Sequence, residues 1–264
     1  MNRLTSKWEA LSRKGEKALI SFITAGDPDL GTTQKLITAL EKGGVDILEL
    51  GVPFSDPMAD GPVIQKASER ALLKGTNLQE ILELVKKTRL KTQIPILLMG
   101  YYNPILSYGL NRYAQDAAAA GVDATLVVDL PPEESWALDR ELKKAGLDLI
   151  YLLSPTSDAE RIHKVARCAR GFIYFVSITG VTGARLQAES DVQKKVAEIR
   201  KYTKIPVVVG FGISTPEQAR QMASTADGIV VGSAFVSFIE KNISHFLEEK
   251  IENYARELKS ALKD

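Results

Sequence analysis

Short apolar segments alternate with longer amphipathic segments along the whole chain, and this alternation restricts the chain to a few folds. Eight apolar runs predict β-strands: 18–24, 45–50, 94–99, 124–128, 147–153, 172–177, 206–210 and 228–232. The remaining amphipathic segments predict helices: 4–14, 29–42, 62–74, 78–88, 108–120, 133–145, 158–168, 191–202, 216–223 and 233–263. Strands that are apolar almost throughout are typical of a parallel sheet that is covered on both faces.

Eight strand–helix units in 264 residues predict an α/β fold, a single (β/α)8 TIM barrel domain that spans residues 1–264. The pattern adds a helix before the first strand and extra helices near strands two and eight. The alternative is a doubly wound open sheet, but no Gly-x-Gly-x-x-Gly turn follows the first strand. Chemistry in a barrel takes place where the strands meet the following helices, so the strand ends are where a site is expected.

The composition excludes several classes of function. The net charge is +1 and no block of like charges occurs, so neither nucleic acid nor an anionic membrane is an expected partner. No apolar run is long enough to cross a membrane, and residues 1–17 lack the pattern of a signal peptide, so we expect a cytoplasmic protein. The single cysteine, Cys168, excludes an internal disulfide, and with only His163 and His245 beside it no metal site is expected.

An acidic residue interrupts the second apolar run. Leu48 and Leu50 face one side of this strand, and Glu49 faces the other. If both faces of the sheet are covered, Glu49 is a carboxyl group in a low-dielectric interior. The turn that follows contains Asp60, and Pro62 two residues later suits the start of a helix. A buried acid and a second acid on the next loop are typical of general acid–base catalysis.

Each acid also has a structural interpretation. Glu49 could form a buried ion pair with a lysine or arginine, and Asp60 could cap the following helix. Their neighbouring positions at the catalytic end of a barrel favour a catalytic pair. We expect desolvation to raise the pKa of Glu49, and we expect the nearby helix N-terminus to keep Asp60 ionised.

Glycines close the seventh and eighth strands. Gly210 and Gly212 follow the seventh, and Gly232 follows the eighth. Glycine lets an anion approach the backbone, and Ser233 begins a helix whose free N–H groups favour negative charge. Barrels often bind phosphate at these two loops, so we predict a phosphate site there. The alternative is that the glycines only make tight turns and that Ser233 only caps its helix.

The connection after strand six, residues 178–187, is longer than usual and contains Gly180 and Gly183. It predicts a lid that closes over the substrate and excludes water, and the alternative is an ordinary surface loop.

Aromatic residues lie near several strand ends. Tyr101 or Tyr102 could line an aromatic-binding pocket. The other candidates for the wall of that pocket are Phe22, Leu126 and Tyr174. Asp129, after the fourth strand, is expected to cap a loop, and the helix predicted from residue 133 would begin with acids in its first turn.

Residues 49–62, ELGVPFSDPMADGP, resemble the signature of the tryptophan synthase alpha subunit family. Other segments are similar to further motifs of that family: 22–28, 103–104, 180–183, 210–213 and 232–233. The resemblance implies a carbon–carbon lyase of tryptophan biosynthesis that cleaves indole-3-glycerol phosphate to indole and glyceraldehyde 3-phosphate. This retro-aldol reaction needs no cofactor in the alpha subunit.

The resemblance also implies the roles of single residues. Glu49 would carry the proton, and Asp60 would hold the indole N–H and stabilise positive charge there. The implied substrate contacts are Phe22, Tyr174, Thr182, Gly183, Gly212, Gly232 and Ser233. Among them, Thr182 is implied to be the lid threonine that meets Asp60 when the lid closes.

The family implies a partner as well: a beta subunit that carries pyridoxal phosphate, in an alpha2-beta2 heterotetramer in which indole passes internally. The residues implied to face this partner are Pro53, Asp56, Asn103 and Pro104. Other interpretations are a stand-alone lyase, another phosphosugar enzyme such as an isomerase, a docking subunit without activity, and a phosphate-binding module. The presence of both Glu49 and Asp60 disfavours the last two.

Overall fold

The structure is a computed structural model, and it describes residues 2–176, 185–210, 212–243 and 246–263. Its strands are β1 (Ala18–Thr24), β2 (Ile47–Gly51), β3 (Ile96–Gly100), β4 (Ala124–Val127), β5 (Asp148–Leu153), β6 (Ile173–Val176), β7 (Val207–Gly210) and β8 (Gly228–Val231). Each strand pairs in parallel with the next, and β1 also pairs with β8, which closes the sheet. The predicted barrel is therefore confirmed, and the open-sheet alternative is wrong.

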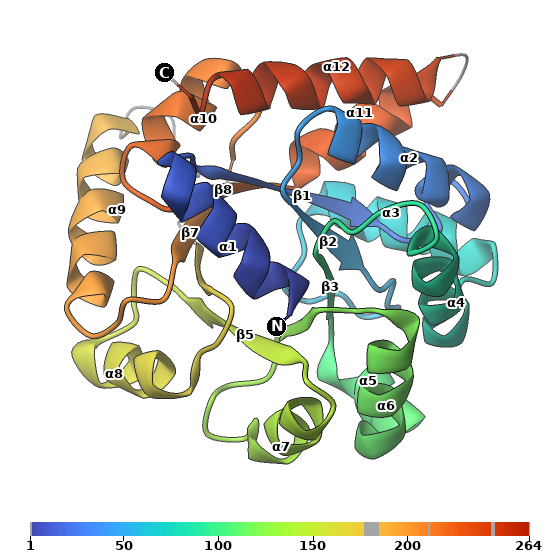
Figure 1. Cartoon of the computed structure of the whole chain (residues 1–264). Helices are drawn as coiled ribbons and strands as arrows, with labels where there is room; N and C mark the ends of the chain where they lie inside the picture. Colours follow the sequence, from blue (N-terminus) through green and yellow to red (C-terminus); the bar gives the residue numbers. More distant parts are fainter. Residues whose placement is uncertain (1, 177–184, 211, 244–245, 264) are drawn as a thin grey trace.

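Helices surround the closed sheet (Figure 1). They are α1 (Arg3–Lys14), α2 (Leu30–Lys42), α3 (Pro62–Leu73), α4 (Leu78–Thr88), α5 (Tyr102–Tyr108), α6 (Leu110–Ala120), α7 (Trp136–Lys144), α8 (Ala159–Cys168), α9 (Arg185–Arg200), α10 (Pro216–Ala223), α11 (Ser233–Lys241) and α12 (Leu247–Ser260). The extra helices predicted before β1, after β2 and after β8 are all present.

Helix α5 was not predicted, because Asn103-Pro104 looks like a turn in the sequence. Pro104 is the third residue of α5, a position where the missing N–H costs nothing, since the first amides of a helix have no partner within it. The first amide of α5, at Tyr102, instead donates to the Asp129 carboxylate over 2.8 Å. Asp129 is thus a cap, but it caps the start of a helix and not the loop that was expected.

Two predicted helix starts are wrong. The helix predicted from residue 133 begins only at Trp136, and Glu133 lies before it, paired with Arg161 and Lys164 over 2.6 Å each. Residues 132–135 form turns, and Ser135 is the N-cap of α7. The helix predicted near residue 191 begins at residue 185, and the helical segment predicted over 233–263 consists of two helices, α11 and α12.

Helix α1 covers the end of the barrel where the strands begin, and it lies in front of the barrel in Figure 1. The Asn2 side chain before α1 donates to the Asp123 carbonyl at the start of β4 over 2.8 Å. Trp8 packs edge-on against Phe172, with ring centroids 5.9 Å apart. The apolar cluster inside the barrel joins α1 to alternate strand residues: Leu4, Trp8, Leu11, Ala18, Ile20, Ile47, Leu97, Ala124, Leu126, Ile150, Phe172, Val208 and Val230. The opposite end of the barrel is left for the site.

Aspartates fix the strand starts. Asp46, Asp123 and Asp227 precede even-numbered strands, and each carboxylate accepts an N–H from the neighbouring odd-numbered strand. The Asp46 carboxylate accepts from Leu19 N–H over 3.0 Å and also pairs with Lys259 of α12 over 2.7 Å. These contacts hold the strand register that decides which side chains face the barrel interior.

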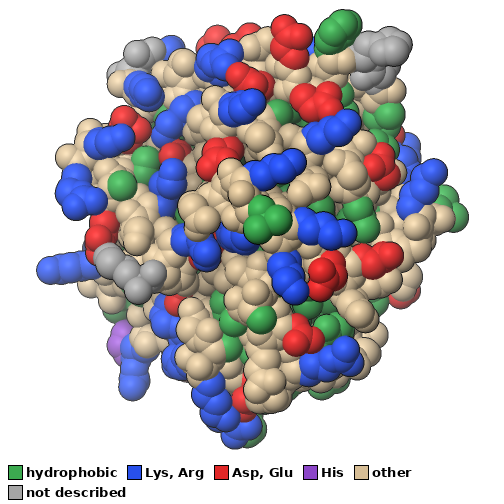
Figure 2. Space-filling model, turned by 45° about the vertical axis from the view of Figure 1, so that its right-hand side comes forward, with side chains coloured by type: hydrophobic (Ala, Val, Ile, Leu, Met, Phe, Trp, Pro, Cys, Tyr) green, Lys and Arg blue, Asp and Glu red, His purple; other side chains and the backbone are tan. Residues whose placement is uncertain are grey.

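Acidic and basic side chains are intermixed over the face shown in Figure 2, as expected from a net charge of +1. Within the described residues, no helix combines the length and the apolar character that a membrane span requires.

Candidate active site

Glu49 lies inside the barrel, where β2 pairs with Phe22 of β1 on one side and Leu97 of β3 on the other. It is 1% exposed, and neither carboxylate oxygen has a hydrogen-bond partner within the described residues. Burial raises the pKa of Glu49 to about 8. No cationic side chain neutralises it there, so the buried ion-pair interpretation is wrong for the described chain.

Asp60 lies on the loop between β2 and α3. The N-cap of α3 is Gly61, without a side-chain hydrogen bond, so the interpretation of Asp60 as a helix cap is wrong. The Asp60 carboxylate instead accepts a hydrogen bond from the Tyr101 hydroxyl over 3.1 Å. Burial raises the pKa of Asp60, and the bond from Tyr101 opposes this rise.

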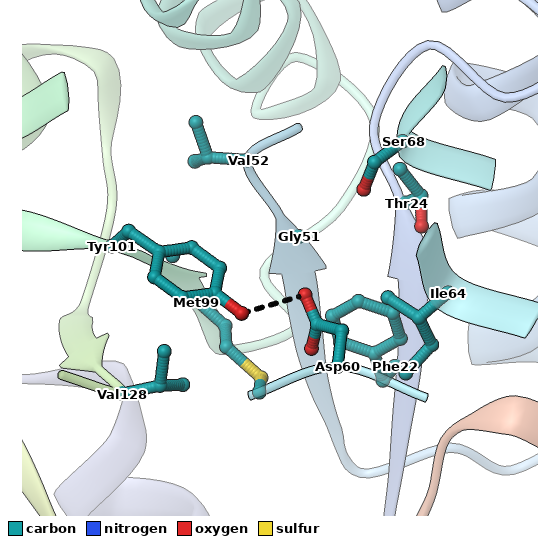
Figure 3. A pocket seen from close by; sticks show the side chains of 11 residues that line it. Phe22, Thr24, Gly51, Val52, Asp60, Ile64, Ser68, Met99, Tyr101 and Val128 are labelled. Atoms are coloured by element: carbon teal, nitrogen blue, oxygen red, sulfur yellow. Dashed lines mark hydrogen bonds between the residues drawn. The ribbon is translucent and has the colours of Figure 1, made fainter. Parts of the chain in front are cut away.

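A small cavity opens beside Asp60 (Figure 3). It is lined by Phe22, Thr24, Gly51, Val52, Asp60, Ile64, Ser68, Met99, Gly100, Tyr101 and Val128. Tyr101 points into this cavity, whereas Tyr102 packs against the apolar layer outside the barrel. Of the two tyrosines, Tyr101 is therefore the one that lines the pocket. Phe22 is 4% exposed and forms part of the wall of this cavity.

The sequence interpretation missed Thr24 and Ser68. Thr24 is the last residue of β1, and its buried hydroxyl has no hydrogen-bond partner within the described residues. Ser68, on α3, lies near Thr24 at the same cavity (Figure 3). The position of Thr24 at a strand end was the available signal, but a threonine among apolar strand residues also fits ordinary β-structure.

Tyr174 of β6 shares the barrel mouth with Glu49. A Cβ at Gly210 of β7 would lie 2.3 Å from the Tyr174 hydroxyl, so only glycine leaves room for this tyrosine. Burial raises the pKa of Tyr174 well above its usual range, and the charge of Glu49 adds to the rise. Two groups that hold their protons at neutral pH thus lie close together.

An open cleft of about 470 Å³ lies beside the two predicted phosphate-binding loops. Its lining includes Gly212 after β7 and Ser233 at the first position of α11, together with Val63, Ile213, Ser214, Ala234, Ser237, Phe238, Lys241 and Tyr254. Gly212 has φ +64°, which glycine adopts without strain, and Gly232 is the N-cap of α11. The loops after β7 and β8 thus lie together at this cleft. Residues 178–184 of the expected lid, which include Thr182 and Gly183, lie outside the described residues.

The residues expected at a partner surface differ in exposure. Asp56 is exposed and accepts a hydrogen bond from the Ser55 hydroxyl, whereas Pro53 is buried within the chain. Asn103 is exposed and Pro104 is half-buried, both in the first turn of α5. Among the described residues, no group of three potential metal ligands lies close together.

The closed barrel, with a buried acid and a second acid at the carboxyl ends of its strands, defines a (β/α)8-barrel enzyme. The family model described as "Tryptophan synthase alpha chain" matches residues 8–263. The chain belongs to this family, and it is a carbon–carbon lyase of tryptophan biosynthesis that cleaves indole-3-glycerol phosphate.

Individual relatives agree over nearly the whole length. The tryptophan synthase alpha chain of Citrifermentans bemidjiense is 56% identical, over 99% of this chain and 98% of that one. The alpha chain of Geobacter sulfurreducens is 55% identical, over 99% of each chain. The crystal structure of tryptophan synthase subunit alpha from Legionella pneumophila superimposes with a TM-score of 0.93 at 40% identity, covering 100% of this chain and 99% of that one.

Proposed function

We propose that Glu49 and Asp60 carry out the cleavage of indole-3-glycerol phosphate. The observation that supports this division of roles most directly is the burial of Glu49 without a cation, which gives it a pKa of about 8. A carboxyl group with that pKa holds a proton at neutral pH and can also release and regain it.

The proton moves in two steps. Protonated Glu49 gives its proton to C3 of the indole, and the ring becomes an electron sink. The Asp60 carboxylate accepts a hydrogen bond from the indole N–H and stabilises the positive charge that develops there. The Glu49 carboxylate then takes the proton of the hydroxyl next to the breaking bond. The carbon–carbon bond to C3 then breaks, and the hydroxyl-bearing carbon becomes an aldehyde. The electron pair of the broken bond returns to the ring, indole is released, and Glu49 is again protonated.

We propose that the substrate phosphate binds in the cleft beside Gly212, Gly232 and Ser233, with Gly183 contributing from the lid. The free N–H groups at the start of α11 favour an anion. Each charge-assisted hydrogen bond is worth roughly 1.5–3 kcal/mol, so three or four bonds orient the substrate firmly. Phe22 and Tyr174 would form the apolar and aromatic walls around the indole, and Thr182 would meet Asp60 on lid closure.

A beta subunit is the proposed partner, in a cytoplasmic alpha2-beta2 complex. The chain itself would need no cofactor, and pyridoxal phosphate would belong to the beta subunit alone. Asp56 and Asn103 are exposed and suit a docking surface, together with Pro104. Because Pro53 is buried, we propose that it shapes the docking loop from within the chain.

The experiment is an indole-release assay with the purified chain and indole-3-glycerol phosphate, with and without a beta subunit. Glu49→Gln removes the proton carrier, and we expect indole formation to fall by ~10² or more. A variant that keeps most of its activity would contradict the role of Glu49. Release of indole at the full rate without a partner would instead favour a stand-alone lyase.

A further inference from the structure

We propose that Tyr101 is a positioning residue for this reaction, because its hydroxyl fixes one oxygen of the Asp60 carboxylate and leaves the other for the substrate. The inference rests on the proposed role of Asp60 and adds a residue to it.

The hydroxyl of Tyr101 makes two hydrogen bonds with fixed direction. It accepts from the Ala59 N–H over 2.9 Å, and it donates to Oδ2 of Asp60 over 3.1 Å. The N–H can only donate, so the hydroxyl proton is free to point at the carboxylate. One phenol therefore holds both the backbone before Asp60 and the Asp60 side chain, and Figure 3 shows the second of these bonds.

Tyr101 is itself held from several sides. It is 5% exposed, and its ring packs against Phe54 with centroids 5.2 Å apart and an angle of 33° between the planes. It is the residue directly before α5, whose first amide is bound by Asp129. The loop after β2 holds the Tyr101 side chain, and Asp129 after β4 fixes the backbone directly after Tyr101, so few other rotamers are available to it. This suits a residue that orients another.

The hydrogen bond from Tyr101 is the contact that favours the ionised form of Asp60. The charges that act on Tyr101 are those of Asp60 and of Asp129 after β4, and the described residues that line the cavity include no cation. The Tyr101 hydroxyl is the group that opposes the effect of burial on Asp60. Burial also raises the pKa of Tyr101 to about 12, so it keeps its proton through neutral pH. Within the described residues, Oδ1 of Asp60 accepts no hydrogen bond and can meet the indole N–H.

The test compares Tyr101→Phe with Tyr102→Phe. The first variant deletes the hydroxyl and keeps the ring on Phe54, and the second removes the hydroxyl of the adjacent tyrosine outside the cavity. For Tyr101→Phe we expect kcat for indole release to fall roughly 10- to 100-fold. The acid limb of kcat/KM should also move to higher pH, because Asp60 loses the bond that lowers its pKa. Tyr102→Phe should match the wild type in both measurements.

A second measurement does not depend on catalysis. In the chain without substrate, the carboxyl 13C chemical shift of Asp60 can be followed by NMR as a function of pH. We expect its pKa to rise in Tyr101→Phe and to stay unchanged in Tyr102→Phe. An unchanged pKa in Tyr101→Phe would overturn the inference even if the wild type cleaves the substrate. Absence of cleavage by the wild type would overturn the proposed function and with it the role of Tyr101 in the reaction, whereas the pKa measurement would still show whether Tyr101 controls Asp60.

Discussion

Replacement of Glu49 with glutamine should make the folded chain more stable. Glu49 is fully buried, and no described side chain compensates its charge. Glutamine has nearly the same shape and stays neutral at every pH, so it resembles the protonated state of the acid. The gain should depend on pH, because the wild-type penalty arises only when the unfolded chain can ionise this carboxyl group.

The size of the gain follows from the two pKa values. The pKa is 4.5 for a free glutamate and about 8 for Glu49 in the folded chain. Because the pKa of Glu49 is higher in the folded chain, this group does not lower the free energy of unfolding below pH 4.5. Its destabilising contribution grows above pH 4.5 and is complete once the pH has risen through 8. At about 1.4 kcal/mol per tenfold change, the wild type should lose roughly 1 kcal/mol at pH 5 and roughly 3 kcal/mol at pH 7. Glu49→Gln should recover these amounts.

Urea unfolding at pH 5 and pH 7 measures the difference. The matched control is Glu83→Gln on α4, which removes an exposed glutamate and leaves the barrel interior unchanged. We expect the stability difference between Glu49→Gln and the wild type to grow by roughly 2 kcal/mol between the two pH values. A difference that is the same at both pH values, or a variant less stable than the wild type at pH 7, would refute the desolvation argument.

Two further predictions concern binding and the frame of the site. Asp60→Asn should reduce kcat more than phosphate affinity. Gly212→Val, at a residue with φ +64°, should reduce phosphate affinity more than kcat. Steady-state kinetics and inhibition by inorganic phosphate separate the two effects, and equal losses in both variants would count against the division of roles. Arg70→Met should destabilise the fold by roughly 2–3 kcal/mol in urea unfolding, because it leaves Asp27, which is 2% exposed, without its paired bonds of 2.8 and 2.9 Å. Its control, Glu240→Gln, removes an exposed partner of Arg70 and should cost less than about 1 kcal/mol. Similar losses in the last two variants would contradict the argument from burial.

The barrel could be predicted from the sequence because each strand is a separate apolar run, and the two-residue period of a strand also places Glu49 on the face opposite Leu48 and Leu50. The same reasoning could not choose between Tyr101 and Tyr102. A shift of one residue turns a strand side chain to the opposite face, and the end of β3 lies one residue beyond its predicted end. Helix α5 begins directly after Tyr101, and its capping partner Asp129 lies 27 residues further on, which no local pattern reveals.

The two acids of the site are chemically similar, and their surroundings separate them. Glu49 has both oxygens without partners in the barrel interior, which favours the protonated form at neutral pH. Asp60 is also desolvated, but it keeps one hydrogen bond from a phenol that favours the ionised form. An acid that gives a proton and a carboxylate that stabilises positive charge are the two groups that retro-aldol cleavage at an indole requires. Burial without hydrogen-bond partners raises the pKa of Glu49, which lowers the stability of the fold at neutral pH and, in the proposed mechanism, provides the proton. Glu49→Gln should therefore stabilise the fold and abolish the proposed proton transfer together.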